Sequence, residues 1–482
     1  MKSVNSFKYT LLLLVLIQKV IATSILCKES EYGKALAVSC DDDPSAVQCK
    51  NYKSRFYNKF QFNSCKFDTL PNLSMGEYHW LHVINISDIG LKTMQLENIV
   101  KFKTLSLLLA NGNELKELPV DIFLKQKINK MELAHNYFTE ISSISRSGAE
   151  ELQYLILSHN NITDIRENDF MNLTQLQTLD LSYNKIQHIS DNSFAELTML
   201  TILILSNNMI TIIGENTFID AYGLIELDLS NNRITNISEN AFVQSNQLIH
   251  LDLSFNALTV IERPIFEHLI NLDTLDLAQN NLSHIEFGIF SNLQSLRHLN
   301  ISGNHLIKID LSHLLSLSVW RLNLSNCEIS EIDGSLRYVF PALDKLDLRN
   351  NNFNCSHLKS ILDNFDDIRG TFETIPSSEL LEKRSYRGIG CHTIEAAAKS
   401  STGMEKIKVI GEISKLSPTE TENEAIVKIL QQNSDAVRMT NILLMVLIAM
   451  LVLVMVGMIL MSAASFQRVR KSDLHNADNN NQ

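Results

Sequence analysis

Apolar positions recur with a period of 24 residues through the middle of the chain. One unit runs from Leu176 to Phe194, and the same spacing returns from Leu200 to Phe218 and from Leu224 to Phe242. Neither a heptad repeat nor an amphipathic helix would hold this register. The pattern therefore predicts a stack of repeated units rather than several separate domains.

One polar position inside the unit recurs twelve times, in steps of 23 or 24 residues. It is occupied by Ile89, Asn113, Asn136, Asn160, Asn184, Asn208, Asn232, Asn256, Asn280, Asn304, Cys327 and Asn351. Just before it, two apolar residues at alternate positions point to one side of a short strand. A single unit cannot bury this apolar side alone, so stacked units form a continuous core behind a parallel sheet. The phenylalanine that ends each unit is expected to form a spine in that core.

Both ends of the chain carry apolar segments with flanks that indicate membrane targeting. Residues 1–22 are typical of a signal peptide, with Lys2 and Lys8 before a short apolar run and small residues near Ala22. Residues 441–465 contain 23 consecutive uncharged residues, from Ile442 to Ala464, which would span about 35 Å as a helix. Basic residues follow directly and predict a cytoplasmic tail at 466–482. Residues 392–440 lose the leucine register and are interpreted as a stalk.

Seven cysteines lie where a stack of repeats needs its ends covered. Cys27, Cys40, Cys49 and Cys65 precede the repeats and allow three disulfide connectivities. Cys355 and Cys391 bracket the segment after the repeats and are predicted to pair. Cys327 is the odd one, and its place in the polar slot predicts a buried free thiol, with an intermolecular disulfide as the alternative. Disulfides require an oxidising compartment.

The spacing L-x-x-L-x-L-x-x-N-x-L is the leucine-rich-repeat signature, and it resembles the repeats of Toll ectodomains, Slit-like guidance proteins and insect repeat-only surface receptors without a TIR domain. The resemblance implies an α/β solenoid, a horseshoe with a parallel concave sheet. It also implies that the slot asparagines bond the backbone of adjacent turns as a ladder, and that such horseshoes bind proteins, often as homo- or heterodimers. The expected organisation is an N-terminal cap at 23–70, about 12 repeats at 71–354, a C-terminal cap at 355–391 with cysteine staples in both caps, and one transmembrane helix.

N-glycosylation sequons mark surfaces that a partner would not use. Eight are expected to carry glycans: Asn72, Asn85, Asn161, Asn172, Asn236, Asn281, Asn300 and Asn323. Asn85, Asn300 and Asn323 would cover both ends of the concave face, which leaves its middle free of strand sequons. The candidate ligand-binding residues are therefore Tyr154, Ile156, Tyr183, Ile202, Ile204, Glu226, Asp228, His250, Asp252, Phe255 and Asp276. Apolar and aromatic side chains rimmed by charge are typical of a protein interface.

No catalytic motif is present: the chain lacks H-E-x-x-H, G-x-S-x-G, P-loop and C-x-x-C patterns. We expect no enzyme activity, no cofactor and no metal, although His135 and His159 would lie side by side in the stack. The formal net charge of −12 argues against a nucleic-acid partner. The sequence therefore predicts a type I plasma-membrane protein that recognises or adheres to a protein ligand. The alternative is an innate-immune or growth-factor-type co-receptor without its own signalling domain.

Overall fold

The computed structural model describes the repeats and short pieces on either side of them. The described residues are 24–26, 28–29, 35–39, 46–48, 59–63, 65–70, 73–74, 81–95, 102, 104–124, 126–314, 318–363, 371–372, 385–386 and 389–392. The predicted signal peptide, stalk, membrane-spanning helix and tail lie outside these residues. Within them, no helix is both long and apolar enough to cross a membrane.

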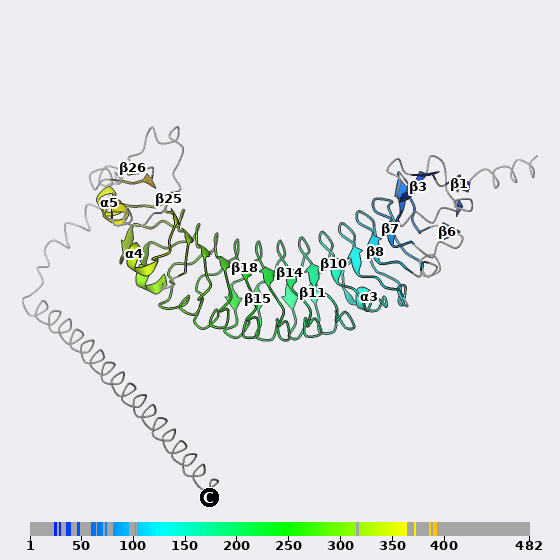
Figure 1. Cartoon of the computed structure of the whole chain (residues 1–482), viewed down its shortest axis with the longest axis horizontal. Coiled ribbons are helices and arrows are strands. Elements are labelled where there is room, and N and C mark those ends of the chain that lie inside the picture. The colour runs from blue at the N-terminus through cyan, green and yellow to red at the C-terminus, as the bar shows by residue number, and fades with distance from the viewer. Residues whose placement is uncertain are drawn as a thin grey trace, which may run out of the picture. The chain divides into compact units, whose positions relative to one another are not determined.

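The repeats form a curved solenoid whose inner side is one parallel sheet (Figure 1). Its strands are three residues long, because a single inward leucine between two outward residues is all that each repeat contributes to it. Twelve of them follow one another in chain order. They are β7 (Val83–Asn85), β8 (Leu107–Leu109), β9 (Lys130–Glu132), β10 (Tyr154–Ile156), β12 (Thr178–Asp180), β14 (Ile202–Ile204), β16 (Glu226–Asp228), β18 (His250–Asp252), β19 (Thr274–Asp276), β20 (His298–Asn300), β22 (Arg321–Asn323) and β24 (Lys345–Asp347).

The same sheet continues beyond the repeats at both ends. Before β7 it holds β2 (Lys28–Glu29), β3 (Ala35–Ser39) and β5 (Lys59–Asn63), and after β24 it holds β25 (Thr371–Phe372). β5 contains Phe60 and Phe62 and pairs with β7, so an irregular unit before the twelve repeats also joins the stack. A separate small sheet is formed by β1 (Ser24–Leu26), β4 (Ala46–Gln48) and β6 (Leu73–Ser74).

The outer side of the solenoid corrects the α/β prediction, because it is built mainly of turns. Its described helices are short: α3 (Ser142–Ser145), η1 (Leu311–Leu314) and α4 (Leu336–Val339). Two-stranded pairs take the remaining outer positions: β11 (Asp164–Ile165) with β13 (His188–Ile189), β15 (Ile212–Ile213) with β17 (Asn236–Ile237), and β21 (Lys308–Asp310) with β23 (Glu331–Asp333). A 24-residue unit leaves too few residues on its return for a helix of several turns.

The slot asparagines form the ladder that the resemblance implies. The Asn208 Nδ2 donates to the carbonyls of Leu181 and Leu205, both at 3.0 Å, while its Oδ1 accepts from the Ile186 N–H at 3.0 Å. One buried carboxamide thus joins the backbone of two neighbouring repeats. This arrangement satisfies backbone groups that would otherwise be buried without partners.

The two slots without asparagine differ in their hydrogen bonds. Ile89 is buried, and its backbone N–H donates to the Asn113 Oδ1 at 3.2 Å. Cys327 is a buried free thiol, as predicted, and its Sγ donates to the carbonyls of Ile301 and Ser325, both at 3.3 Å. Burial raises the pKa of the Cys327 thiol to about 11, which keeps it in the protonated, donating form.

The phenylalanines form the expected core spine on the return side. Phe170, Phe194, Phe218 and Phe242 stack in sequence, with ring centroids 5.6, 6.1 and 5.8 Å apart. Phe266 and Phe290 stack in the same way at 6.2 Å. All are buried, so each ring bridges two neighbouring repeats and couples their stability.

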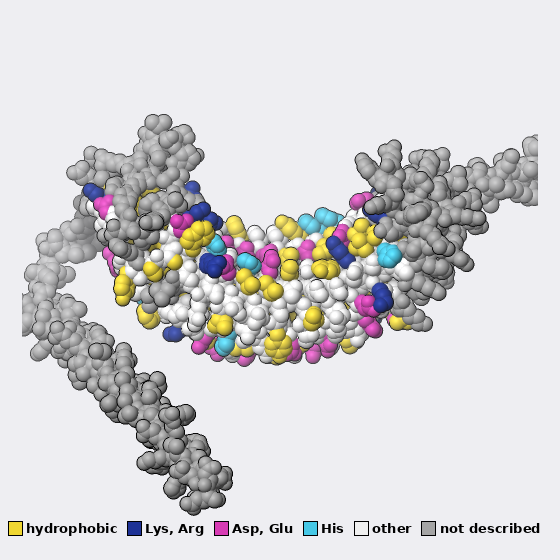
Figure 2. All heavy atoms as spheres, viewed as in Figure 1, with side chains coloured by type: hydrophobic (Ala, Val, Ile, Leu, Met, Phe, Trp, Pro, Cys, Tyr) yellow, Lys and Arg dark blue, Asp and Glu magenta, His cyan; other side chains and the backbone are white. Residues whose placement is uncertain are grey.

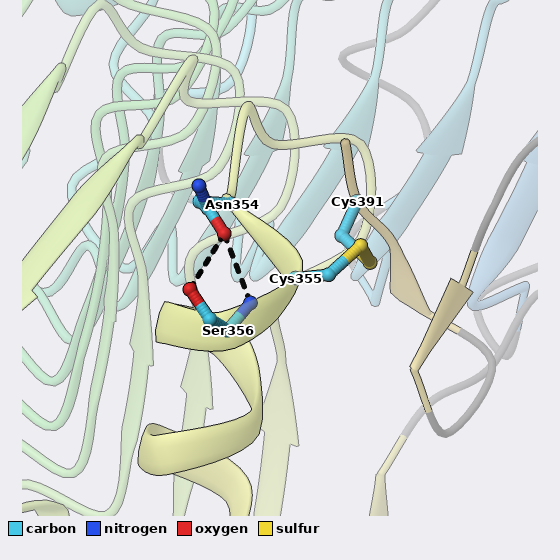
Figure 3. Close-up of a disulfide and its surroundings, with 4 residues drawn as sticks. All are labelled: Asn354, Cys355, Ser356 and Cys391. Carbon is cyan, nitrogen blue, oxygen red and sulfur yellow. Dashed lines mark hydrogen bonds between the residues drawn. A yellow bond between two sulfur atoms is a disulfide. The ribbon is translucent and has the colours of Figure 1, made fainter. Parts of the chain in front are cut away.

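The segment after the repeats is tied back by a disulfide between Cys355 and Cys391, as predicted (Figure 3). Cys355 begins helix α5 (Cys355–Asp363), and Cys391 follows β27 (Ile389–Gly390), which pairs with β26 (Ser385–Tyr386). Before the repeats, Cys65 is disulfide-bonded, and Cys27, Cys40 and Cys49 lie outside the described residues.

Candidate functional site: the concave sheet

The outward positions of the short strands form one continuous surface along the inner curve. In each strand the central residue is buried, and the residues on either side of it face outward. Because neighbouring strands pair in parallel and in register, equivalent side chains of successive repeats lie in columns. The sheet therefore brings together residues that are 24 positions apart in the sequence.

Nine of the predicted ligand-binding residues lie in these columns. Tyr154 and His250 are exposed, and the half-buried members are Ile156, Ile202, Ile204, Glu226, Asp228, Asp252 and Asp276. Ile202 and Ile204 flank the inward Leu203 of β14, so two aliphatic side chains face outward from a single strand. Tyr154 stands two strands away on β10. The central concave face thus carries an apolar group beside a charged one.

Tyr183 and Phe255 correct the prediction that placed them on strands. Both lie in the turn that precedes a ladder asparagine, with φ of 54° and 53°, a backbone region that non-glycine residues rarely adopt. Each is held there because its N–H donates to a carbonyl one repeat later, Ser206 for Tyr183 and Ala278 for Phe255. Their rings are about half exposed, at 51% and 53%, along the border of the concave sheet.

This border carries an aromatic stack that sequence reasoning did not foresee. The His135 and His159 rings lie 4.2 Å apart and nearly parallel, and the Tyr183 ring continues the stack 4.3 Å from His159. The two histidines are adjacent, as expected, but they meet face to face. Among the described residues there is no group of three His, Cys, Asp or Glu side chains that could hold a metal ion. Figure 2 shows histidine and hydrophobic side chains along this inner edge and acidic side chains along the outer edge.

Three aspartates lie side by side on adjacent strands, where Asp228, Asp252 and Asp276 are in register. Each carboxylate accepts a hydrogen bond from the backbone N–H two residues later, at 2.8 to 2.9 Å. Burial raises the pKa of the central Asp252 carboxyl above its ordinary value, and the Asp276 and Asp228 charges raise it further. The centre of the concave face is therefore a band of crowded negative charge.

Replacing Asp252 with asparagine is expected to raise Tm at pH 7 by about 1–2 °C. The variant keeps the acceptor for the Ser254 N–H and removes a charge that the fold disfavours. A carboxyl whose pKa is raised on folding destabilises the folded state when ionised, so the gain should shrink as the pH falls through that raised pKa. Thermal unfolding at pH 7 and pH 4 measures this difference.

Asp180→Asn is the matched control, because Asp180 has the same strand position but its neighbours in register are Ile156 and Ile204. It should gain less at pH 7 than Asp252→Asn. A lower Tm for Asp252→Asn at pH 7 would contradict the prediction.

Towards the C-terminal end of the sheet, the concave face is hollow and carries both basic and acidic residues. A cavity of about 430 Å³ opens over β19, β20, β22 and β24. Its polar lining residues are Thr274, Asp276, His298, Asn300, Arg321, Asn323, Lys345 and Asp347. Sequence analysis missed this site, because it excluded the strands that carry sequons. Arg321 and Lys345 at equivalent outward positions of neighbouring repeats, with Trp320 directly before Arg321, were the signal that could have revealed it.

The sequons fall into two groups by exposure. Asn172, Asn236 and Asn281 are exposed and Asn161 is half-buried, while Asn72 lies outside the described side chains. The strand sequons Asn85, Asn300 and Asn323 are half-buried, and each Oδ1 accepts from the N–H two residues later. Asn354 lies in a ninth sequon, and its Oδ1 accepts hydrogen bonds from the Ser356 N–H and hydroxyl at the start of α5 (Figure 3).

Comparison with known proteins identifies the repeats. Three segments, 150–210, 198–258 and 247–306, match a family model described as leucine rich repeat, so this part of the chain consists of leucine-rich repeats. Comparison with curated proteins finds no match.

Solved structures share the fold at low sequence identity. The crystal structure of the LRIM1/APL1C complex matches with a TM-score of 0.59 and 18% identity, covering 87% of this chain and 80% of that chain. The complex of Toll with Spatzle from Drosophila matches with a TM-score of 0.57 and 18% identity, covering 71% of this chain and 54% of that chain. A TLR13–ssRNA13 complex matches with a TM-score of 0.54 and 21% identity, covering 66% and 50%. The chain thus spans about half the length of the TLR13 and Toll chains.

Proposed function

We propose that this chain is a single-pass cell-surface glycoprotein that recognises a protein ligand through the concave face of its repeats. The observation that carries the proposal is the group of exposed aromatic and aliphatic side chains on the central strands and their border. Tyr154 is 38% exposed, Phe255 is 53% exposed, and Ile202 and Ile204 face outward together. Such side chains beside charged ones suit a protein interface better than a solvated surface.

The fold neighbours support recognition rather than catalysis. The Toll–Spatzle and LRIM1/APL1C structures are protein complexes, and each contains a chain that shares this solenoid. A leucine-rich-repeat solenoid typically serves as an interaction scaffold. Display at the cell surface rests on the sequence alone: the signal peptide, the apolar segment 441–465 with its basic flank, and the sequons. Exposed Asn172, Asn236 and Asn281 are the first candidates for glycans.

The test is a cell-aggregation assay with the full chain expressed on cells that do not otherwise adhere. The wild-type chain should cluster the cells, and a variant with Tyr154, Ile204 and Phe255 all changed to Asp should lose clustering. Burying three unpaired charges against a protein partner costs more binding free energy than the three original side chains contribute. The expected loss of affinity is therefore at least about a hundredfold. Surface staining confirms equal display of both chains.

A matched variant changes Ile212, Val260 and Ile307 to Asp on the outer side, where these residues are 57%, 37% and 61% exposed. It introduces the same charges into the same kind of residue and should leave clustering intact. Equal clustering by the concave variant and the wild type would refute the concave site. Capture of soluble ligand without clustering would identify a ligand-binding co-receptor instead of an adhesion protein.

A further inference from the structure

Two cations line the cavity at the C-terminal end of the concave sheet without an acidic partner. Arg321 on β22 and Lys345 on β24 are in register on adjacent strands. Neither forms an ion pair with any residue in the described part of the chain. Both cations instead lie near the Trp320 ring, whose centroid is 5.9 Å from the Arg321 guanidinium and 6.0 Å from the Lys345 ammonium. Two positive charges therefore stand unneutralised at one hollow.

The acidic groups at this hollow are already engaged. Asp347 is buried and binds the Arg349 guanidinium with both oxygens, so it does not neutralise the two free cations. Asp276, on the opposite wall, accepts a hydrogen bond from the Asn300 Nδ2 at 2.9 Å. The Trp320 ring is 41% exposed and offers an apolar wall beside the charges. An anionic group with an alkyl stem matches this lining in charge and polarity.

The surroundings favour one acidic side chain over a continuous polyanion. The band of Asp228, Asp252 and Asp276 begins two strands before Arg321, at a spacing of about 4.8 Å per strand. A polysaccharide sulfate or a nucleic-acid strand laid along the sheet would meet this band and be repelled. A protein can present a single carboxylate to Arg321 and Lys345 and basic groups to the aspartate band.

We propose that the cavity over β20, β22 and β24 is a subsite for a glutamate or aspartate side chain of the protein ligand, bound between Arg321 and Lys345 against Trp320. This inference rests on the proposed function and adds the chemistry of the ligand. The basic groups of the same ligand lie over the aspartate band. The concave face thereby sets the orientation of its ligand along the sheet as well as its affinity.

The subsite requires that Asn300 and Asn323 carry no glycan, although both are sequons. Both line the cavity, so an attached sugar would fill it. The Asn300 Nδ2, the atom to which a glycan would be joined, donates to Asp276 across the strand pair. Mass spectrometry of glycopeptides from the purified full chain should therefore show both asparagines unmodified, and a glycan on either would overturn the inference.

Binding is tested by titrating the purified full chain with a blocked pentapeptide that carries one glutamate between glycines, at low salt, and following tryptophan fluorescence. Trp320 is one of two tryptophans, and Trp320→Phe shows which part of the response it supplies. The response should be saturable and should weaken with added salt. The double variant Arg321→Gln and Lys345→Gln should bind at least about tenfold more weakly. Lys116→Gln with Lys185→Gln removes the same charge from exposed positions elsewhere and should bind like the wild type.

The same peptide with glutamine in place of glutamate should give no response, since it lacks the carboxylate. Equal binding of the glutamate peptide by the Arg321/Lys345 variant and the wild type would overturn the subsite, as would tighter binding of a heparin fragment or single-stranded RNA through the same two residues. The aggregation assay separates this inference from the proposed function. If the Tyr154, Ile204 and Phe255 variant abolishes clustering while the Arg321/Lys345 variant does not weaken it, the subsite fails and the concave recognition surface stands.

Discussion

Replacing Asn208 with leucine is expected to lower the free energy of unfolding by about 3–5 kcal/mol, the largest effect that we predict for a single ladder position. The substitution conserves approximate size but removes the side-chain bonds to the Leu181 and Leu205 carbonyls and to the Ile186 N–H. Each carbonyl keeps a second bond, from the Nδ2 of Asn184 or Asn232, so each bond lost there costs about 1 kcal/mol. The buried Ile186 N–H is left unpaired, which costs about 1–3 kcal/mol more. Denaturant unfolding monitored by circular dichroism measures the loss.

Asn246→Leu provides the control, because Asn246 is exposed on the return side and the same substitution there removes no buried ladder bond. It should change stability by no more than about 0.5 kcal/mol. A comparable loss at both positions would mean that the ladder bonds contribute little and that apolar burial alone holds the repeats together.

Replacing Phe218 with alanine is expected to cost about 3–5 kcal/mol. Phe218 is 1% exposed and stacks between Phe194 and Phe242, so its removal opens a cavity that touches both neighbouring repeats. In a solenoid the interfaces between repeats supply much of the stability, and this one residue serves two of them. The unfolding transition should also broaden, because the stack becomes less cooperative at its middle.

Two variants bracket this result. Phe218→Leu retains most of the buried volume and should cost less than half as much, since relatively volume-conserving swaps are best tolerated. Phe287→Ala removes the same ring from a side chain that is 58% exposed, and should stay within about 1 kcal/mol of the wild type. Equal costs for Phe218→Ala and Phe287→Ala would contradict the spine.

Much of the solenoid was predictable because its contacts repeat with the sequence. The register that puts Leu203 inward and Ile202 and Ile204 outward follows from the two-residue alternation of a strand. The slot asparagines were equally predictable, since a buried carboxamide at a constant spacing needs backbone partners at a constant spacing. Cys327 shows that a thiol can take the place of the asparagine as a donor in this slot.

Sequence reasoning misplaced the position that comes directly before each ladder slot. Tyr183 and Phe255 were expected on strands, but their backbones adopt positive φ because each N–H donates to a backbone carbonyl of the next repeat. An α/β solenoid was predicted, but the described return side is mostly turns. In both cases a local propensity yields to a constraint from the neighbouring repeat.

The sequence by itself determined the repeat length, the inward and outward positions, the ladder slots and the Cys355–Cys391 pair, because each depends on local periodicity or on the place of a residue relative to the repeats. Only the tertiary structure decided which outward side chains stand together. The His135, His159 and Tyr183 stack and the cavity beside Arg321 and Lys345 are products of lateral spacing between strands. Strand pairing places residues that are 24 positions apart next to one another. The pattern along the chain does not predict whether their side chains repel, stack or leave a hollow.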